Sequence, residues 1–555
     1  MQFNEIRTRN ELADFLGIER KVMTYVLFVA KVDSFYVSFD IPKKDGTSRS
    51  IFAPQRELKT IQSKLAQKLW NYQLFLFGKG RKRSNISHAF EKDKSIISNA
   101  NIHKNKRIIV CFDLKDFFDS FHFGRVAGFF EKNRDYKLPR EVSVTIAQLT
   151  CYKGHLPQGA PSSPIITNLI CDILDAHLLK IARKYRLDYT RYADDLTFST
   201  NSKIFLKQQE DFVDAIRKEI ESSGFQLNDS KTRIIYKDSR QQVTGLIVNR
   251  KINVPVEFYK NTRAMAMSLY KKGEFTINGQ KGTLKQLEGR FAFIDQIEHY
   301  NNKHDLSGKK HSKFTLSAKE KAYRNFLFYE YFVANNKMLL LTEGKTDILY
   351  IKAALKKLYK DYPKLITKDS DGKFRYRLSF FKRTKKWEYF FGMSKDGADA
   401  MKSIYSYFDP SSNQNLCKYF KKLHTTFSEH PIVFLFDNEK ETKRPLKAFI
   451  SCAKLTQQQR DLLAKNNHLC LEDSVELNLV SVPLPKGKDE CELEDLFSKE
   501  TLELKIDGRS FSRKDEDKRT CYNKDVFSKY IFKHYSEIDF SGFRPLLDIL
   551  NEIIK

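Results

Sequence analysis

The 555-residue sequence lacks a long hydrophobic run and lacks cysteine pairs at zinc-binding spacing. Its first residues, Met1 to Glu5, carry neither the basic stretch nor the apolar stretch that directs secretion. The eight cysteines do not suggest a zinc finger or a disulfide framework. These absences argue against a membrane-spanning protein and a zinc-dependent module, and they predict a reduced, cytosolic protein with no membrane partner.

Acidic residues are also in deficit. The sequence has 98 Lys and Arg against 69 Asp and Glu, a formal net charge of +29 at pH 7. A protein this basic is expected to bind a polyanion. The cations are spread in short runs such as Lys382 to Lys386, which favours an extended groove, although one such run is also typical of an ordinary solvated surface. At about 150 residues per domain, the length predicts three or four domains.

The residues from Arg191 to Phe198 are typical of a strand, a tight turn and a second strand, with Asp194 and Asp195 at the turn. Two adjacent carboxylates repel each other and favour a bound cation, and Mg²⁺ prefers such oxygen ligands. A solvated Asp-Asp turn is the common alternative. The β-prone flanks favour a metal site, and a polymerase metal site requires a third carboxylate from elsewhere in the chain.

Asp113 is the predicted third carboxylate. It follows Arg107 to Phe112, a short apolar run typical of a buried strand, and a carboxylate at the end of such a strand is costly unless it is paired or binds metal. Asp116 and Asp119 are alternatives, but they lie beyond the apolar run, where a turn exposes them. Asp113 and the Asp-Asp turn are therefore expected to be catalytic and to hold two Mg²⁺ ions about 3.5–4 Å apart.

A basic hairpin is predicted upstream, where Lys43, Lys44 and Arg49 surround an Asp-Gly turn. Such a hairpin can grip a nucleoside triphosphate through charge and bidentate hydrogen bonds, although exposed hairpins are often basic. Phe118, which follows Asp113 closely, is expected to stand beside the incoming sugar and exclude a ribose 2′-hydroxyl. This predicts deoxynucleotide substrates; an ordinary core phenylalanine is the alternative.

Two further residues are candidates for nucleotide binding. Gln158 lies in a Pro-Gln-Gly turn, where its amide can reach a base or sugar, although the same composition fits a plain helix start. Lys231 lies beyond the Asp-Asp turn and can neutralise phosphate or donate a proton to pyrophosphate, with a surface lysine as the alternative. The order Asp, Pro-Gln-Gly, Asp-Asp is hard to obtain by chance.

Residues from about 20 to 330 resemble a reverse transcriptase, with fingers and palm over 1–235 and a thumb and linker over 236–330. Two further signatures resemble the retron branch and disfavour a group II intron maturase, whose extra modules are not found. The residues that the resemblance assigns to RNA binding lie just before the Asp113 strand and after Lys231: Asn99, His103, Val243, Thr244 and Gly245.

This resemblance implies an α+β right-hand fold and an RNA-directed DNA polymerase. A retron enzyme binds its own structured noncoding RNA (msr-msd) and primes from an internal guanosine 2′-hydroxyl. It then uses deoxynucleoside triphosphates to copy part of that RNA into branched msDNA. The helical, basic thumb would recognise A-form duplex through backbone and 2′-hydroxyl contacts.

A second unit is predicted over 335–555. The apolar run Met338 to Leu341 leads to Glu343, and the run Ile432 to Phe436 leads to Asp437 and Glu439. Acidic groups at the carboxyl ends of two strands, in an alternating strand and helix pattern, predict a parallel sheet with a metal site at its switch point.

These two motifs resemble the α/β TOPRIM fold, which implies that Glu343, Asp437 and Glu439 bind one or two Mg²⁺ ions. Glu439 departs from the usual Asp-x-Asp, but a glutamate is an equivalent ligand. Two short later segments, Leu493 to Phe497 and Asn523 to Phe527, resemble motifs of overcoming-lysogenisation-defect nucleases. The alternative interpretation is that they are a surface acidic helix and an ordinary lysine. By that resemblance the further site residues are Glu494 and Asp495 as metal ligands and Lys524 as a catalytic cation.

The sequence thus predicts a bacterial, cytoplasmic retron reverse transcriptase fused to a TOPRIM nuclease, and the resemblance implies a role in phage defence. One alternative is a non-catalytic RNA-binding regulator of a TOPRIM toxin. Another is an intron-derived or domesticated polymerase whose C-terminal unit processes its product. The oligomeric state stays open, including self-association through nucleic acid or the C-terminal unit.

Overall fold

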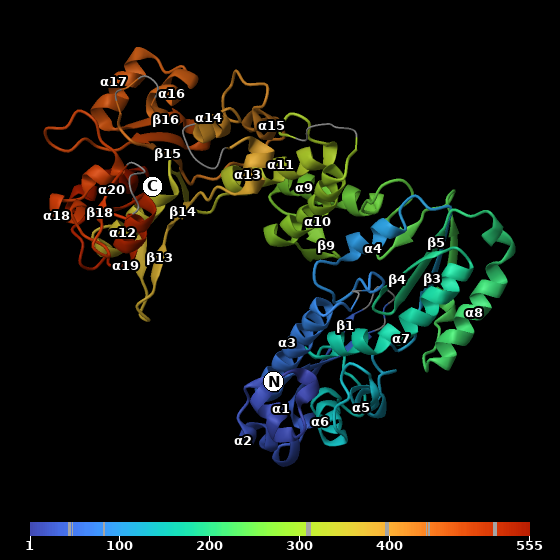
Figure 1. Cartoon of the computed structure of the whole chain (residues 1–555). Helices are drawn as coiled ribbons and strands as arrows, with labels where there is room; N and C mark the ends of the chain where they lie inside the picture. The colour runs from blue at the N-terminus through green and yellow to red at the C-terminus, as the bar shows by residue number, and fades with distance from the viewer. Residues whose placement is uncertain are drawn as a thin grey trace. The chain divides into compact units, whose positions relative to one another are not determined.

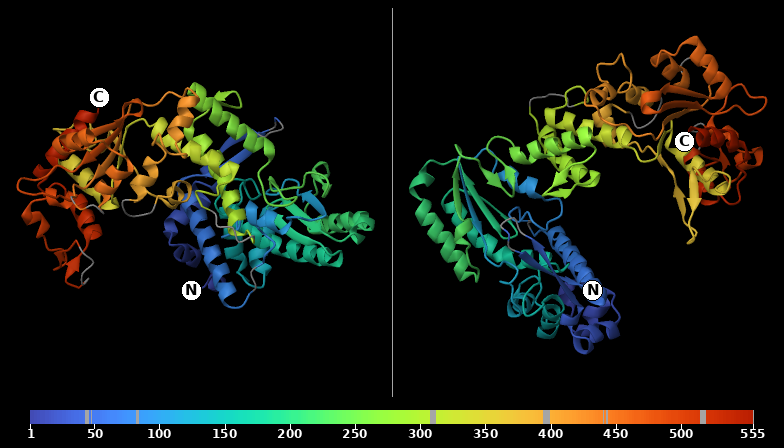
Figure 2. Two further views of the ribbon diagram at one scale, coloured as in Figure 1. Left: turned by 90° about the horizontal axis from the view of Figure 1, so that it is seen from above. Right: turned by 180° about the vertical axis from the view of Figure 1, so that it is seen from behind.

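The computed structural model describes residues 1–42, 46, 48–81, 84–306, 312–393, 399–439, 441, 444–513 and 519–554. The chain forms two compact units, Met1–Pro255 and Val256–Lys555 (Figures 1 and 2). The boundary between the two units follows Pro255 and therefore lies inside the segment 236–330 that the sequence assigns to a thumb and linker. Lys43 and Lys44 of the predicted basic hairpin lie outside the described residues.

The N-terminal unit contains an antiparallel sheet in the order β4-β5-β3-β6. Ile108, Val110 and Phe112 belong to the core on one face of this sheet, which α7 and α8 cover (Figure 1). Strand side chains alternate between faces, so Asp113 belongs to the opposite face. The strands are β3 (Ile108–Asp113), β4 (Asp188–Tyr192), β5 (Asp195–Thr200) and β6 (Arg233–Tyr236); the two helices are α7 (Ser163–Lys184) and α8 (Gln209–Ser222).

A hairpin and a set of helices complete this unit. β1 and β2 pair as an antiparallel hairpin in which Ile41 lies opposite Arg49. β7 and β8 form a second, short hairpin. The bounds are β1 (Tyr36–Pro42), β2 (Ser48–Pro54), β7 (Gln242–Val243), β8 (Leu246–Ile247), α1 (Arg9–Leu16), α2 (Arg20–Thr24), α3 (Arg56–Gly78), α4 (Ile96–Ile102), α5 (Phe123–Lys132) and α6 (Arg140–Thr150).

The C-terminal unit begins with three helices that share a hydrophobic core with the sheet that follows. Leu269, Phe291 and Phe326 belong to the same cluster as Leu339 and Phe434 of that sheet. The helices are therefore part of the C-terminal core. The bounds are α9 (Val256–Lys272), α10 (Leu284–Lys303) and α11 (Ala318–Phe328), with the short strands β9 (Thr276–Ile277) and β10 (Gln280–Lys281).

The sheet of this unit has the strand order β14-β11-β15-β17-β16, and its strands are parallel except for β16 at one edge. Both of its faces are buried: Leu339 and Leu341 of β11 belong to one core cluster and Leu340 to the other. This explains why β11 and β15 are continuous apolar runs. The strands are β11 (Met338–Leu341), β14 (Leu378–Phe380), β15 (Ile432–Phe436), β16 (His468–Glu472) and β17 (Leu477–Ser481).

Helices and short paired strands surround this sheet (Figures 1 and 2). The helices are α12 (Lys345–Lys357), α13 (Lys385–Phe391), α14 (Asp399–Tyr405), α15 (Leu416–Lys422), α16 (Pro445–Cys452), α17 (Gln457–Asn466), α18 (Lys499–Leu502), α19 (Lys524–Lys533) and α20 (Arg544–Ile553). The short strands are β12 (Ile366–Lys368), β13 (Phe374–Tyr376), β18 (Ser510–Phe511) and β19 (Cys521–Tyr522).

Candidate active sites

The three predicted palm carboxylates come together at one end of the N-terminal sheet. Asp113, the last residue of β3, lies directly opposite Asp195, the first residue of β5. Asp194 precedes it in the turn, and its carbonyl oxygen accepts a hydrogen bond from the amide of Leu114 at 3.0 Å. Ala193 has φ +57°, which produces the tight turn between β4 and β5. Strand register thus places the carboxylates side by side.

The electrostatics of this site favour a cation. Burial, together with the negative charges of Asp194 and Asp113, raises the pKa of Asp195 to about 6. Burial and the charge of Asp113 also raise the pKa of Asp194. The Nζ of Lys231 lies 3.0 Å from both carboxylate oxygens of Asp113 and offsets only part of this charge.

These carboxylates fit Mg²⁺ in their chemistry, since crowded oxygen ligands with raised proton affinity are stabilised by a divalent cation. Within the described ranges, no three His, Cys, Asp or Glu side chains are drawn together closely enough to enclose an ion. The three carboxylates therefore fit Mg²⁺ in the type of ligand atom they offer and in their place at one end of the sheet.

A buried ion pair that the sequence did not reveal lies beneath the Asp-Asp turn. Arg191 is fully buried and binds Asp175 through Nε at 2.9 Å and Nη2 at 2.9 Å. Tyr189 donates a further hydrogen bond to Asp175 at 2.9 Å. The Nη1 of Arg191 also reaches the carbonyl oxygen of Ala193 at 3.4 Å. The pair therefore ties the turn to α7, and no local sequence pattern marks the two residues as partners.

The Pro-Gln-Gly turn is fixed against the hairpin. The carbonyl oxygen of Gln158 accepts a hydrogen bond from the amide of Phe52 at 2.8 Å. Gly159 has φ +120°, and a Cβ there would lie 2.7 Å from the Cγ2 of Ile51. Only glycine fits this close approach, which leaves the half-buried Gln158 at the junction of the turn and β2.

Two other predicted nucleotide-binding residues lie in the same unit. Arg49 is exposed on β2, and its positive charge acts on Asp194, whose pKa it lowers against the stronger effect of burial. Phe118 is half-buried and packs edge-on against Phe117, with ring centroids 5.5 Å apart. Its predicted contact with the sugar stays a prediction.

The predicted RNA-binding residues before β3 are buried. His103 is fully buried, with Nδ1 2.8 Å from the Ser199 hydroxyl and Nε2 2.7 Å from the Thr190 hydroxyl. Burial lowers the pKa of His103 to about 3. Asn99 is also buried, at 1% exposure. The two ring contacts of His103 hold the end of α4 against the strands, and RNA binding by Asn99 and His103 stays a prediction.

The second retron-like signature lies beside α4. Val243 is buried, whereas Gly245 is exposed and has φ +82°. Thr244 donates a hydrogen bond to the carbonyl oxygen of Ile96 at 3.3 Å, and Ile96 begins α4. The structure therefore joins the two signatures, and Gly245 is the exposed member.

A second carboxylate group lies at the carboxyl ends of β11 and β15. Glu343 Oε1 accepts a hydrogen bond from the amide of Asp437 at 2.9 Å, and Asp437 Oδ1 accepts one from the amide of Leu493 at 2.9 Å. Burial raises the pKa of Glu343 to about 8 and raises that of Asp437 well above its usual value. The strand ends and the later acidic segment thus meet.

Asp347 is a member of this group that the sequence reading missed. Its Oδ2 accepts a hydrogen bond from the amide of Gly344 at 2.8 Å, which caps α12. Burial, together with the negative charge of Glu494, raises the pKa of Asp347 to about 6. The available signal was the spacing Glu-Gly-x-x-Asp, in which the last residue lies in the first helical turn and faces back toward Glu343.

Glu494 and Asp495 have different surroundings. Glu494 is 1% exposed; its Oε2 lies 3.1 Å from Lys524 Nζ, and its Oε1 is buried with no hydrogen-bond partner among the described residues. Asp495 instead pairs with Lys488 at 2.6 Å and Arg513 at 2.7 Å. Burial would raise the pKa of Asp495, but these hydrogen bonds outweigh it and bring the pKa to about 2.

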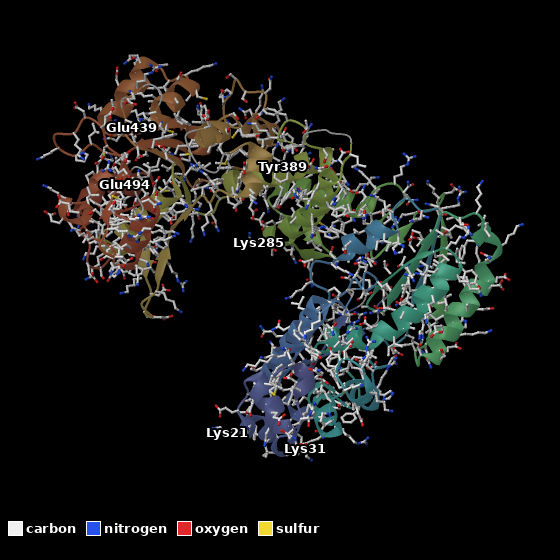
Figure 3. The ribbon with its side chains drawn as sticks, viewed as in Figure 1. Lys21, Lys31, Lys285, Tyr389, Glu439 and Glu494 are labelled. Atoms are coloured by element: carbon white, nitrogen blue, oxygen red, sulfur yellow. The ribbon has the colours of Figure 1, made fainter. Side chains whose placement is uncertain are left out.

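Glu439 and Glu494 lie in the same unit (Figure 3). Glu439 is 7% exposed and pairs with Arg444 at 3.3 Å. Glu492, also missed by the sequence reading, shares Lys524 with Glu494 at 3.1 Å. The unpartnered Glu494 oxygen and the raised pKa values of its neighbours fit a divalent cation in donor chemistry.

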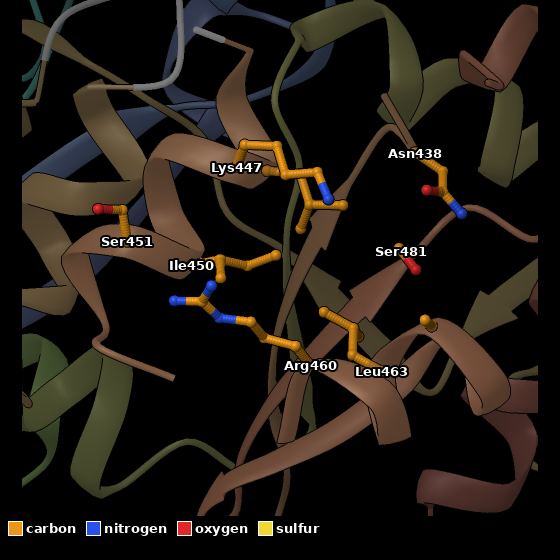
Figure 4. Close-up of a pocket in the computed structure, with 9 residues that line it drawn as sticks. Asn438, Lys447, Ile450, Ser451, Arg460, Leu463 and Ser481 are labelled. Atoms are coloured by element: carbon orange, nitrogen blue, oxygen red, sulfur yellow. The ribbon is translucent and has the colours of Figure 1, made fainter. Parts of the chain in front are cut away.

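A cavity of about 380 Å³ adjoins Asn438, the residue between Asp437 and Glu439. Lys447 and Arg460 enter it from α16 and α17, with Ser481 at the end of β17 (Figure 4). Its polar and basic lining lies at the same carboxyl edge of the sheet as the acidic group.

No helix among the described residues is both long and apolar enough to cross a membrane.

Comparisons with known proteins match the N-terminal part of the chain. The family model for "Reverse transcriptase (RNA-dependent DNA polymerase)" matches residues 41–253. Retron Ec86 reverse transcriptase of Escherichia coli is 33% identical over 52% of this chain and 85% of that protein. Retron Mx162 reverse transcriptase of Myxococcus xanthus is 34% identical over 53% of this chain, but the match spans only 64% of the relative.

Solved structures give a weaker comparison. An apo telomerase from Candida tropicalis is 16% identical over 41% of this chain and 56% of that chain, with a TM-score of 0.30. A TM-score this low supports no functional argument. The comparisons do not show a TOPRIM domain for the C-terminal part of the chain.

Proposed function

Since the chain belongs to the retron reverse transcriptase family, we propose that its N-terminal unit is an RNA-directed DNA polymerase. The observation that carries this proposal is the pairing of Asp113 with Asp195 across neighbouring strands, with Asp194 in the adjoining turn. Such a carboxylate group is suited to holding the cations of nucleotidyl transfer.

The chemistry follows from the placement of these side chains. Mg²⁺, when bound, activates the attacking hydroxyl and stabilises the leaving group. Asp113, Asp194 and Asp195 would hold it. Lys231, 3.0 Å from Asp113, places a positive charge where substrate phosphate is neutralised, and exposed Arg49 adds another on the hairpin. Positioning and charge neutralisation supply most of the acceleration in phosphoryl transfer.

Membership of the family also supports a proposal for the template and the product. The curated relatives are named retron reverse transcriptases, so the proposed template is a structured noncoding RNA (msr-msd) and the proposed product is branched msDNA made from deoxynucleotides. The formal net charge of +29 supports a polyanionic partner.

The test is primer extension with Mg²⁺, deoxynucleotides and an RNA template. Asp194→Ala combined with Asp195→Ala should lower the rate on the order of 10³-fold or more, because it removes two of the three carboxylates. Asp211→Ala, an exposed acid on α8, is the matched control and should retain activity. A double variant that extends primers at the wild-type rate would disprove the assignment of the site.

A second function is proposed for the C-terminal unit: a Mg²⁺-dependent TOPRIM-like nuclease. The supporting observation is the meeting of Glu343, Asp347 and Asp437 at the carboxyl ends of two parallel strands, with Glu494 and Lys524 beside them. Lys524 is placed to stabilise charge that develops on a phosphate. A role in phage defence is proposed on the resemblance alone.

Glu343→Ala should abolish nucleic-acid cleavage and toxicity while leaving DNA synthesis intact. Glu503→Ala, which changes an exposed acid of the same unit, is the control. Cleavage by the Glu343→Ala variant at the wild-type rate would contradict the nuclease assignment, and loss of DNA synthesis in that variant would contradict the independence of the two sites.

A further inference from the structure

A cavity of about 680 Å³ opens beside Glu343 in the C-terminal unit. Thr342 and Gly344, the two neighbours of Glu343 in the chain, both line it. The remaining wall comes from three parts of the fold. These are the first turns of α12, the segment from the end of β14 to the start of α13, and α19.

The lining of this cavity is strongly basic. Among the described residues that line it there is a single carboxylate, Asp525, which is already paired with Lys345 at 3.3 Å and Lys529 at 2.6 Å. That carboxylate cannot balance the other cations of the wall. The six cationic residues of the lining are Lys345, Lys352, Lys382, Arg383, Lys385 and Lys529.

The cations also repel one another. Burial lowers the pKa of Lys352, and the positive charges of Lys382 and Lys356 lower it further. Like charges held together at a cavity wall cost free energy that a bound anion offsets. Arg383 is held in place, because its Nη2 donates a hydrogen bond to the carbonyl oxygen of Thr342 at 2.6 Å. The basic wall is thus fixed directly beside the candidate catalytic glutamate.

We propose that this cavity binds the phosphates of a nucleic-acid strand and places a neighbouring phosphodiester at Glu343. This assignment rests on the proposed nuclease function and names its substrate class. Positive charge contributed by three elements suits several phosphates along a backbone. Within the described part of the lining, Phe381 is the single aromatic side chain, and it is only 3% exposed. The cavity is therefore suited to contacting the phosphate backbone and not to stacking on bases.

Lysine footprinting on the full-length protein tests this locally. An amine-reactive reagent modifies lysines, and mass spectrometry reports Lys352, Lys382 and Lys385 separately from any lysine in the N-terminal unit. A 12-nucleotide single strand should protect these three several-fold. The exposed Lys360 and Lys418 lie outside the cavity lining and should stay reactive.

Separate titrations with ATP and with inorganic phosphate distinguish the source of the phosphate. Protection by the strand at lower concentration than by either small anion supports a backbone site. Protection by ATP or phosphate alone overturns the strand assignment and leaves a small-anion site. No protection by any of the three overturns the proposal.

Charge reversal supplies a second measurement. Lys382→Glu with Lys385→Glu should raise the strand concentration that half-protects Lys352 by at least about tenfold. The slope of log affinity against log salt concentration should become shallower by about 1.4, because each lost single-strand phosphate contact changes it by about 0.7. Both residues are exposed, so the fold should tolerate the change. The matched control is Lys360→Glu with Lys418→Glu, which should leave the midpoint unchanged. An equal shift in both double variants would show a general charge effect and refute the cavity.

Different results would refute the cavity proposal and the proposed nuclease function. If strand cleavage depends on Glu343 but the cavity lysines stay reactive, the cavity proposal is wrong and the function stands. If the lysines are protected but no strand is cleaved with Mg²⁺, the cavity stands as a binding site and the proposed nuclease function is wrong.

Discussion

The buried Arg191–Asp175 pair gives the sharpest prediction for the polymerase unit. Arg191→Met removes the guanidinium and leaves the Asp175 carboxylate 2% exposed, with Tyr189 as its remaining donor at 2.9 Å. Removing one partner of a buried ion pair costs about 3–5 kcal/mol, because the other charge stays buried without compensation. At roughly 2–4 °C per kcal/mol for a unit of this size, the unfolding midpoint should fall by roughly 6–20 °C.

Replacing both partners separates stability from positioning. Arg191→Met combined with Asp175→Leu should recover stability to within about 2 kcal/mol of wild type, since apolar residues replace both charges. Activity should not recover with it. The contact from Arg191 to the carbonyl oxygen of Ala193 at 3.4 Å is still missing, so the Asp-Asp turn loses its support.

The assay is urea unfolding read by hydrogen exchange in peptides from residues 188–200, together with steady-state primer extension. In the double variant, kcat should fall by about tenfold or more while KM for deoxynucleotide changes little. Wild-type kcat in a stable double variant would refute the positioning role. A single variant that loses less than about 1 kcal/mol would refute the reasoning about the buried charge.

Two further predictions concern the same unit. Because the folded-state pKa of Asp195 is raised to about 6, that carboxyl favours folding below its usual pKa and loses this contribution as pH rises through 6, so Mg²⁺ should stabilise the protein more at pH 7.5 than at pH 5. The measurement is the Mg²⁺-dependent melting shift of wild type minus that of the Asp194→Ala, Asp195→Ala variant, and equal differences at the two pH values would contradict it. Gly159→Ala should destabilise the N-terminal unit by about 1–3 kcal/mol in thermal unfolding, because its Cβ would meet Ile51 at 2.7 Å in a left-handed backbone; an unchanged midpoint would show that the hairpin moves away freely.

Local pattern was sufficient to predict the strand ends that carry the first site. An apolar run followed by Asp113, and a β-prone turn containing Asp194 and Asp195, are features of a few consecutive residues. The structure brings these ends together through the register of β3 and β5. A one-residue slip would move the apolar side chains out of the core, so the hydrophobic pattern fixes the register as well.

Contacts between distant elements could not be predicted in the same way. Arg191 and Asp175 belong to a strand and a helix, and neither residue has a local pattern that names the other. His103 presents the reverse problem. Its motif assigned it to RNA binding by resemblance, and the motif contained no sign that its two ring nitrogens would contact Ser199 and Thr190 inside the unit. Burial depends on the whole packed core, which a short motif does not contain.

The two pairs of adjacent acids show why local backbone geometry decides function. Asp194 and Asp195 lie where a tight turn enters β5. Besides burial, the charge of Asp113 raises the pKa of both, so the two carboxylates belong to one candidate site. Glu494 and Asp495 lie in η8 (Leu493–Leu496), a 3₁₀ turn in which successive side chains diverge. Asp495 caps its own turn at the Glu492 amide, 2.8 Å away, while Glu494 is buried beside Lys524. Two adjacent acids therefore contribute together to one candidate site on a hairpin, whereas on a 3₁₀ turn only one of the two carboxylates points inward.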